Sequence, residues 1–198
     1  MLYEITHYIQ SKIPWLWDVF EEGNALAFSL LHYRKLKDIP GLLENISDKY
    51  HVTIAINEDA KALTQFFVQQ PEESFKFFKP HEFDEKTVSK LINRKSFLMF
   101  LVKDGEEIVG YFFLRCFANG SAFKGRIVDS NHRNMGIAKL MGNAINNVVL
   151  HLGLRLFTTI SPENYTSLAS TKAVNDIKIV RTLENGYYYI ECFPKKSV

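Results

Sequence analysis

The sequence AFKGRIVDSNHRNMGIAKLM, residues 122–141, decides the fold. Residues 122–128 read as a strand, and from Ile137 onward apolar residues recur at the spacing of one helix face. The short polar segment between them contains Gly136, which allows the backbone a tight turn where the helix opens. The stretch therefore predicts a strand that runs directly into a long helix, which Gly153 is placed to end.

The segments before this stretch predict antiparallel strands. Residues 97–102 and 108–116 flank the turn dipeptide Asp104-Gly105, and Asn119-Gly120 separates the second run from residues 122–128. Such dipeptides suit the positive φ angles of hairpin turns, so the three runs form a meander.

A strand–helix pattern precedes and follows the meander. A short strand at 52–56 leads into a helix capped by Asn57, and Asp84 caps a second helix. After the long helix we expect a strand at 154–160, a helix at 164–174 and a hairpin of 177–183 with 187–193. The sequence predicts an α/β (α+β) fold with a mixed, mostly antiparallel sheet.

The first fifty residues read as helix-biased, with Pro40-Gly41 as a breaker near their end. We expect residues 1–50 to form a helical extension packed on a domain of residues 51–198.

Composition excludes several classes of protein. A length of 198 residues with 46% hydrophobic residues fits one globular core, and a net charge of +2 offers no general basic field for nucleic acid or membrane. No apolar run is long enough to span a membrane, and the N-terminus lacks the pattern of a signal peptide. We expect a cytoplasmic protein that binds no metal, with Cys116 and Cys192 as buried free thiols.

The junction around Gly136 has the chemistry of an anion site. Unpaired N–H groups at the first turn of a helix and the helix dipole together favour a phosphate group there. Arg133 adds a guanidinium at the mouth and Lys139 adds a second charge nearby. The motifs of nucleoside triphosphatases, dinucleotide enzymes, zinc hydrolases and α/β-hydrolases are absent from the chain.

In this context the chain resembles the GNAT acetyltransferase superfamily, whose acetyl-CoA signature R/Q-x-x-G-x-G/A is matched by Arg133, Gly136 and Ala138. The resemblance covers about residues 52–193. It implies helices on both faces of the sheet and a splayed central strand pair, with pantetheine lying in the gap as a pseudo-strand. It also implies acetyl-CoA as the acyl donor. The residues that the resemblance places at the cofactor are Ile127, Val128, Arg133, Asn134, Met135, Gly136, Ile137, Ala138, Lys139, Asn164 and Ser167.

The catalytic groups are less well defined than the cofactor site. A protonated amine needs a base. The candidates are Asp129 at the strand end, His81 in the Phe-rich linker (residues 77–83) and His132 in the phosphate loop (residues 129–136). Where the family often has a Tyr that protonates the leaving thiolate, this chain has Thr171. Ser170, Tyr165 or water could then supply a proton, although a thiol leaves tolerably without a strong acid. The linker residues Phe78, His81 and Glu82 are the predicted substrate-binding residues.

These residues predict transfer of an acetyl group to a small-molecule primary amine, with an amino sugar as the first guess, by direct attack in a ternary complex. Two alternatives stay open: a non-catalytic module that binds CoA or a partner, and a peptide or protein N-acetyltransferase. We also expect that the terminal hairpin could pair two subunits into a homodimer.

Overall fold

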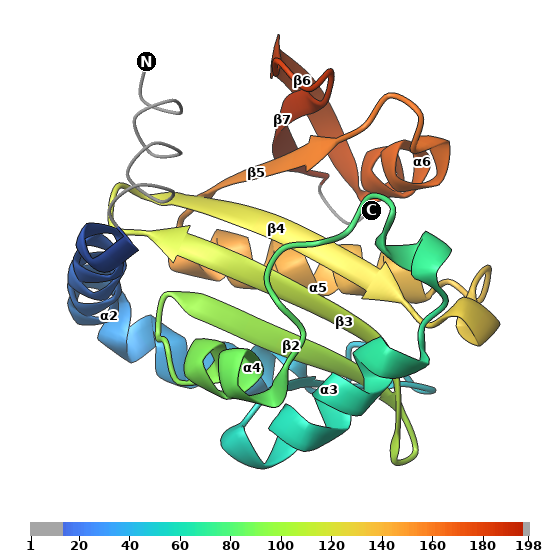
Figure 1. Cartoon of the computed structure of the whole chain (residues 1–198), viewed down its shortest axis with the longest axis horizontal. Coiled ribbons are helices and arrows are strands. Elements are labelled where there is room, and N and C mark those ends of the chain that lie inside the picture. The colour runs from blue at the N-terminus through green and yellow to red at the C-terminus, as the bar shows by residue number, and fades with distance from the viewer. Residues whose placement is uncertain (1–13, 196–198) are drawn as a thin grey trace.

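The structure, a computed structural model, describes residues 14–195 and contains five helices around one sheet (Figure 1). Residues 1–13 of the predicted N-terminal extension and residues 196–198 of the predicted domain lie outside the described residues. The helices are α2 (Pro14–Leu43), α3 (Ala60–Gln69), α4 (Glu85–Ile92), α5 (Ile137–Leu152) and α6 (Tyr165–Val174), with 3-10 turns η1 (Asn57–Asp59), η2 (Glu72–Phe75) and η3 (Ser130–His132). The strands are β1 (His51–Ile54), β2 (Phe97–Asp104), β3 (Glu107–Phe117), β4 (Ser121–Val128), β5 (Arg155–Ile160), β6 (Asn175–Thr182) and β7 (Tyr188–Pro194).

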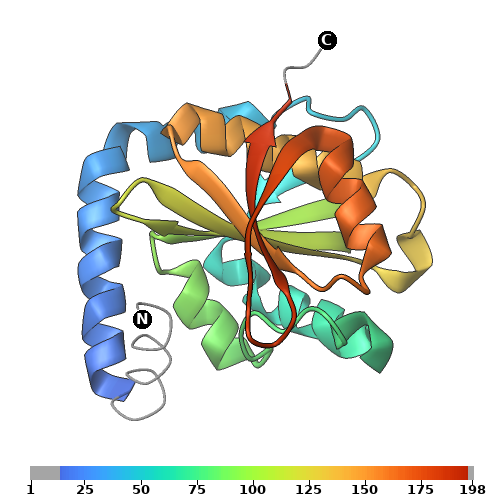
Figure 2. The same ribbon diagram turned by 90° about the horizontal axis from the view of Figure 1, so that it is seen from above.

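The sheet has the order β1-β2-β3-β4-β5-β7-β6, and every neighbouring pair is antiparallel except β4 with β5. One hydrophobic core lies between the sheet and helices α2 and α5, and a second lies between the sheet and helices α3 and α4 (Figures 1 and 2). The predicted fold class is therefore confirmed. None of the helices within residues 14–195 is long and apolar enough to cross a membrane.

The only parallel pair in the sheet, β4 with β5, is paired over a short length. The ladder runs from Ser121 with Arg155 to Phe123 with Phe157 and then stops, although both strands continue. Figure 1 shows the two strands diverging beyond that point. The splayed strand pair is confirmed, and it leaves one edge of the second half of β4 without a partner strand.

Two local predictions were wrong. Pro40-Gly41 does not break the first helix, because α2 continues through Pro40 to Leu43. A proline near a helix end removes only its own amide bond, and the next turn still closes through Glu44 N to Pro40 O at 3.3 Å. Asn57 does not cap α3, because it opens the 3-10 turn η1 and α3 begins only at Ala60.

Other local predictions are confirmed. Asp84 caps α4 by accepting a hydrogen bond from Thr87 N at 2.9 Å, and Gly153 ends α5 with φ +73°. Cys116 and Cys192 are buried free thiols, and burial raises the pKa of both.

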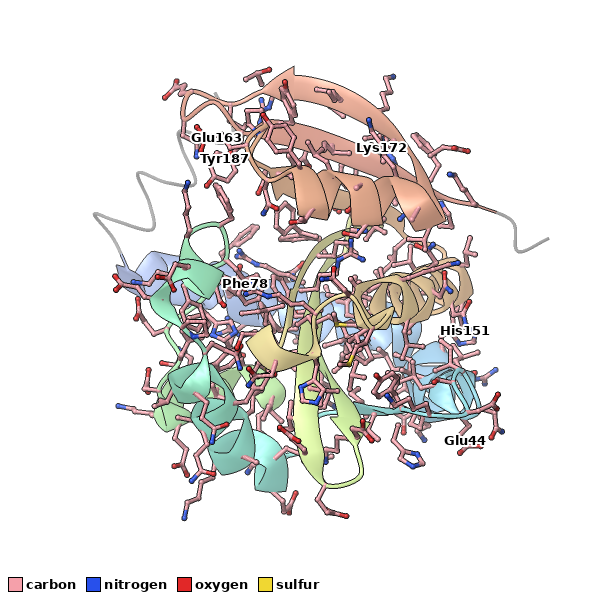
Figure 3. All side chains as sticks on the ribbon, turned by 90° about the vertical axis from the view of Figure 1, so that its right-hand side faces the viewer. Glu44, Phe78, His151, Glu163, Lys172 and Tyr187 are labelled. Carbon is pink, nitrogen blue, oxygen red and sulfur yellow. The ribbon has the colours of Figure 1, made fainter. Side chains whose placement is uncertain are left out.

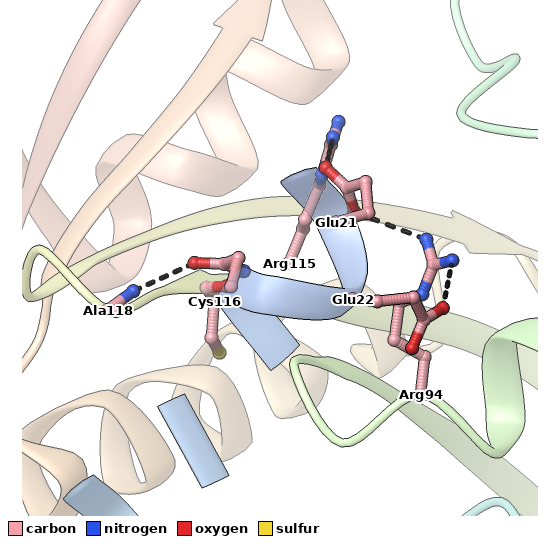
Figure 4. A network of polar contacts seen from close by, with 7 residues as sticks. Glu21, Glu22, Arg94, Arg115, Cys116 and Ala118 are labelled. Carbon is pink, nitrogen blue, oxygen red and sulfur yellow. Dashed lines mark hydrogen bonds and ion pairs between the residues drawn. The ribbon is translucent and has the colours of Figure 1, made fainter. Parts of the chain in front are cut away.

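Helix α2 is fastened to the sheet by polar contacts (Figure 4). The carboxylate of Glu21 pairs with Arg94 at 3.2 Å and with Arg115. One turn on, Asn24 donates to Cys116 O and accepts from Ala118 N, each at 3.0 Å. These contacts hold the first turns of α2 against the end of β3.

Candidate functional site

The junction between β4 and α5 has the backbone geometry of an anion site. Gly136 lies in the left-handed region, with φ +81°, and a Cβ there would meet no atom within 4 Å. Lys139 N and Leu140 N donate to Gly136 O, so the amides before them in the first turn have no intrahelical partner. These free N–H groups and the helix dipole make the junction suitable for a phosphate.

Asp129 holds the phosphate loop in place. Its carboxylate accepts hydrogen bonds from Gln70 Nε2 at 2.7 Å, from Asn131 N at 2.9 Å and from His132 Nδ1 at 2.8 Å. Gln70 also accepts from Ser130 N at 3.0 Å. The amide side chain of Gln70, at the end of α3, therefore makes hydrogen bonds to two consecutive residues of the loop. Burial opposes the charged form of Asp129, but these hydrogen bonds outweigh it and leave its pKa lowered.

The second half of β4 exposes backbone to the gap left by β5. Residues 124–128 pair with β3 on one side only. At the closed end of the gap, one residue beyond the end of the ladder, Thr158 Oγ1 donates to Lys124 O at 3.2 Å. From there to Val128 the open edge measures roughly 13 Å at about 3.3 Å per residue, long enough to pair with an extended ligand.

Helix α6 forms the opposite side of the gap. Asn164 caps it by accepting from Ser167 N at 3.1 Å. Ser170 donates to Ser167 O and accepts from the guanidinium of Arg126, which crosses from β4. The same guanidinium donates to Thr171 at 3.1 Å and to Ala138 O on α5 at 2.7 Å, so Arg126 ties α5 and α6 to the open strand.

These features line one groove of about 1290 Å³. Its wall includes twelve of the predicted site residues: Phe78, Ile127, Val128, Arg133, Asn134, Gly136, Ile137, Ala138, Asn164, Tyr165, Ser167 and Ser170. Met135 and Lys139, also predicted at the cofactor, are exposed residues of the junction but do not line the groove. Figure 3 shows two further wall residues, Glu163 and Tyr187, on the upper side with Phe78 below them.

Aromatic rings form the part of the groove nearest the Phe-rich linker. Phe78 and Phe113 lie over Gly125, where a Cβ would come within 2.4 Å of Phe113 Cε1 and 3.2 Å of Phe78 Cε2. A glycine is therefore required on β4 for these rings to lie against the strand. The other rings that line the groove are Phe75, Phe77, Phe117, Phe123, Phe157, Tyr165, Tyr187 and Tyr189.

The structure does not bring the two predicted bases to the groove wall. Asp129 is 8% exposed and faces the loop that it caps. His81 sits among aromatic rings, with Nδ1 2.7 Å from Glu82 O and Nε2 3.0 Å from the Tyr111 hydroxyl, and burial lowers its pKa. The predicted substrate residue Phe78 is on the wall, whereas His81 and Glu82 are not. Within residues 14–195, no three His, Cys, Asp or Glu residues gather as a metal site.

Three residues that line the groove, Lys124, Arg126 and Thr158, were not among the site residues predicted from the sequence. His132, a candidate base in the sequence, also lines the groove. The sequence did contain a signal for Lys124 and Arg126. They are two residues apart in β4 and therefore lie on the same face of the strand, between the non-polar residues Phe123, Gly125 and Ile127. Two charged residues on a strand face that packs against a helix are unusual.

Several solved acetyltransferases share this arrangement of elements. The GNAT domain of PAT from S. lividans superposes with a TM-score of 0.63 at 20% identity, covering 72% of this chain and 89% of that one. AAC(6')-Ib in complex with ribostamycin and coenzyme A gives 0.59 at 11% identity, covering 75% and 94%. The Salmonella typhimurium acetyltransferase that modifies the N-terminal serine of ribosomal protein L7/L12 gives 0.59 at 17% identity, covering 76% and 96%.

The fold of this chain is thus the GNAT acetyltransferase fold. No protein-family model matches the sequence, and no curated protein matches it. The structural neighbours include an acetyltransferase bound to a small molecule and one that modifies a protein, so they differ in the acyl acceptor.

Proposed function

We propose that this protein transfers an acyl group, in the simplest case acetyl, from coenzyme A to a primary amine by direct attack in a ternary complex. One observation carries the proposal: the left-handed Gly136 at the start of α5 and the open edge of β4 line the same groove. A phosphate site at one end of a strand edge that lacks a partner suits a ligand with both phosphates and an extended amide arm. The fold, shared with solved coenzyme A complexes, supports the same donor.

The residues present fit this cofactor. The amides of Gly136, Ile137 and Ala138 would hold the pyrophosphate, with Arg133 and Lys139 supplying charge and Asn134 and Met135 shaping the turn. The backbone of Ile127 and Val128 would pair with the pantetheine arm, and Asn164 and Ser167 would meet it from α6. When bound, the cofactor supplies an acyl group activated as a thioester.

We propose that Asp129 acts as a positioning residue through His132. Its bond to His132 Nδ1 fixes the ring so that Nε2 is directed away from Asp129, and His132 lines the groove. His132 lies in the phosphate loop, so its ring would contact the phosphates of the donor. The acceptor amine would then lose its proton through water, with Asp129 or His81 as a relay rather than as a base in contact with the substrate.

The groove also limits the acceptor. Its wall carries seven basic residues, Lys76, Lys79, Arg115, Lys124, Arg126, Arg133 and Arg181, against two acidic ones, Glu73 and Glu163. A polycationic amino sugar gains little from such a field, whereas an amine with an aromatic or anionic part fits it. We therefore propose a small primary amine with a single ammonium group, and the aromatic wall is the part of the groove that would contact it.

The alternatives predict different outcomes in one assay. Release of coenzyme A thiol from acetyl-CoA in the presence of single amines, amino sugars or short peptides would identify the acceptor class. Tight binding of acetyl-CoA without thiol release for any of them would instead favour a non-catalytic module. Association of two chains through the terminal hairpin remains a proposal, supported by β6 forming an outer edge of the sheet with Ile179 and Val180 about half exposed.

Acetyl-CoA is expected to stabilise the fold. At a hundredfold excess over its Kd, binding adds about 2.7 kcal/mol to the free energy of unfolding. For a chain of this size the gain corresponds to a rise of roughly 5–11 °C in Tm. Differential scanning fluorimetry with acetyl-CoA, and with adenosine as the control that lacks the pantetheine arm, measures it. An unchanged Tm with millimolar acetyl-CoA, or an equal rise with adenosine, contradicts the cofactor assignment.

Loss of a hydroxyl near the thioester is expected to have a small effect on turnover. Ser170 is held by Ser167 O and Arg126, and Tyr165 is 76% exposed, so neither is locked in the position of a strong acid. A thiolate with a pKa near 8.5 leaves without one. Ser170→Ala and Tyr165→Phe should each lower kcat by less than about tenfold, or about 1.4 kcal/mol. A thousandfold loss in Tyr165→Phe, with acetyl-CoA affinity unchanged, would make Tyr165 the acid.

A further inference from the structure

Two cations lie at the inner end of the groove without an anion. Lys124 and Arg126 are two residues apart on β4, so both side chains project from the face of the sheet that α5 covers. Lys124 is 3% exposed, and within residues 14–195 its Nζ has no hydrogen-bond partner. Within the described residues, Arg126 donates hydrogen bonds to neutral groups: Ala138 O, Ser170 Oγ and Thr171 Oγ1.

The electrostatics of the pair show an uncompensated charge. Burial, reinforced by the charge of Arg126, lowers the pKa of Lys124 to about 8, and burial lowers the pKa of Arg126 to about 10. The Cys192 thiol interacts with both cations, but burial raises its pKa, so it stays neutral near pH 7 and does not balance their charge. Buried charges are ordinarily paired, so this pair calls for an anion from outside the described chain.

The position of Lys124 and Arg126 in the groove indicates which part of a bound donor would reach them. The β4–β5 ladder ends at Phe123 with Phe157, and Lys124 and Thr158 form the closed end of the gap. The phosphate loop at Gly136 lies at the other end of the open strand edge. A donor held by its phosphates at Gly136 therefore directs its acyl end toward Lys124. This step rests on the proposed function.

We propose that the acyl group ends in a carboxylate, as succinyl does, and that Lys124 and Arg126 bind that carboxylate. An acetyl methyl group leaves both cations unpaired, and the phosphates are held too far along the strand to neutralise them. A terminal carboxylate satisfies the free donors of Lys124 and forms a charge-assisted hydrogen bond with Arg126. The site would thus select a short dicarboxylic acyl-CoA.

The chemistry of transfer is unchanged by this choice. The amine nitrogen forms a bond to the thioester carbon, and the carbon–sulfur bond breaks with the electron pair leaving on sulfur. The acceptor, an ammonium ion near neutral pH, loses one proton before the attack and a second as the amide forms. One of these protons ends on the thiolate and the other in solvent. The distal carboxylate takes no part in bond making, and the product amine carries an amide that ends in a carboxylate.

Calorimetric binding of three donors tests the proposal without requiring an acceptor. Succinyl-CoA and butyryl-CoA have four-carbon acyl chains that differ in the terminal group, and acetyl-CoA reports binding of the shared part. We expect succinyl-CoA to bind at least about tenfold tighter than butyryl-CoA. Lys124→Met, which keeps the length of the side chain and removes its charge, should bring this ratio close to one. Lys61→Met, which removes an exposed lysine from α3 outside the groove, should leave the ratio as it is.

Each result decides the matter. Equal affinities for succinyl-CoA and butyryl-CoA, with clear binding of acetyl-CoA, overturn the carboxylate site and leave the proposed function standing. A preference for succinyl-CoA that survives Lys124→Met places the carboxylate elsewhere and also overturns the assignment. No binding of any of the three donors overturns the proposed function itself. If Lys124→Met does not fold, equal affinities of the unmodified protein for succinyl-CoA and butyryl-CoA still overturn the carboxylate site.

Discussion

A Gly136→Glu variant is expected to lose at least about a hundredfold in affinity for acetyl-CoA while keeping its fold. The new carboxylate would project from the first turn of α5 into open space, where the pyrophosphate is proposed to lie. One like-charge pair at about 4 Å costs about 1–4 kcal/mol, depending on solvent access, and the pyrophosphate presents two phosphates. Steric exclusion from the turn adds to this repulsion, since a larger side chain occupies the position of the ligand.

Isothermal titration calorimetry with acetyl-CoA measures the loss, and Gly105→Glu is the matched control. Gly105 also has a positive φ, +58°, and open space at its Cβ, so the control carries the same kind of backbone strain in a hairpin turn away from the groove. Arg133→Ala should weaken binding only about tenfold or less, because the backbone amides remain and Arg133 already donates to Ser74. Retained affinity in Gly136→Glu would show that the phosphates bind elsewhere.

The elements of the fold could be predicted because their signals are local. Asp104-Gly105 and Asn119-Gly120 fix hairpin turns, and the apolar period after Ile137 fixes a helix face. The turn that opens α5 could be predicted for the same reason, since Gly136 supplies a left-handed conformation between a strand and a helix. Both depend on neighbours in the sequence.

The catalytic assignments depend on contacts between distant segments, and the sequence does not contain these contacts. Asp129 looked like a free carboxylate at a strand end, but Gln70, 59 residues away, occupies one of its oxygens. His81 looked like part of an open linker, yet it packs on Tyr111 in the second core. From the sequence alone, Arg126 is a polar residue of a strand with no assigned partner. The packing of α6 against the gap shows that its guanidinium reaches Ser170.

A Glu21→Ala variant is expected to lose about 1.5–3 kcal/mol of unfolding free energy, because it removes the buried carboxylate that Arg94 and Arg115 share. The side chain of Glu21 is 4% exposed and that of Arg94 is 9% exposed, and the same carboxylate also pairs with Arg115 (Figure 4). Arg94 keeps its contact with Glu22, but water replaces the lost carboxylate poorly beside a side chain this buried. For a chain of this length the loss corresponds to a fall of roughly 3–12 °C in Tm.

Glu22→Ala is the matched control for this prediction. Glu22 pairs with Arg94 at 2.9 Å, but its side chain is 67% exposed, so its removal should cost less than about 1 kcal/mol. Glu21→Gln should fall between the two, since the amide oxygen still accepts a hydrogen bond while the charge is lost. Urea unfolding followed by circular dichroism ranks the three variants. If Glu21→Ala were no worse than Glu22→Ala, α2 would be held by its apolar face alone, through Phe28 and Ile39, and its ion pairs would contribute no net stability.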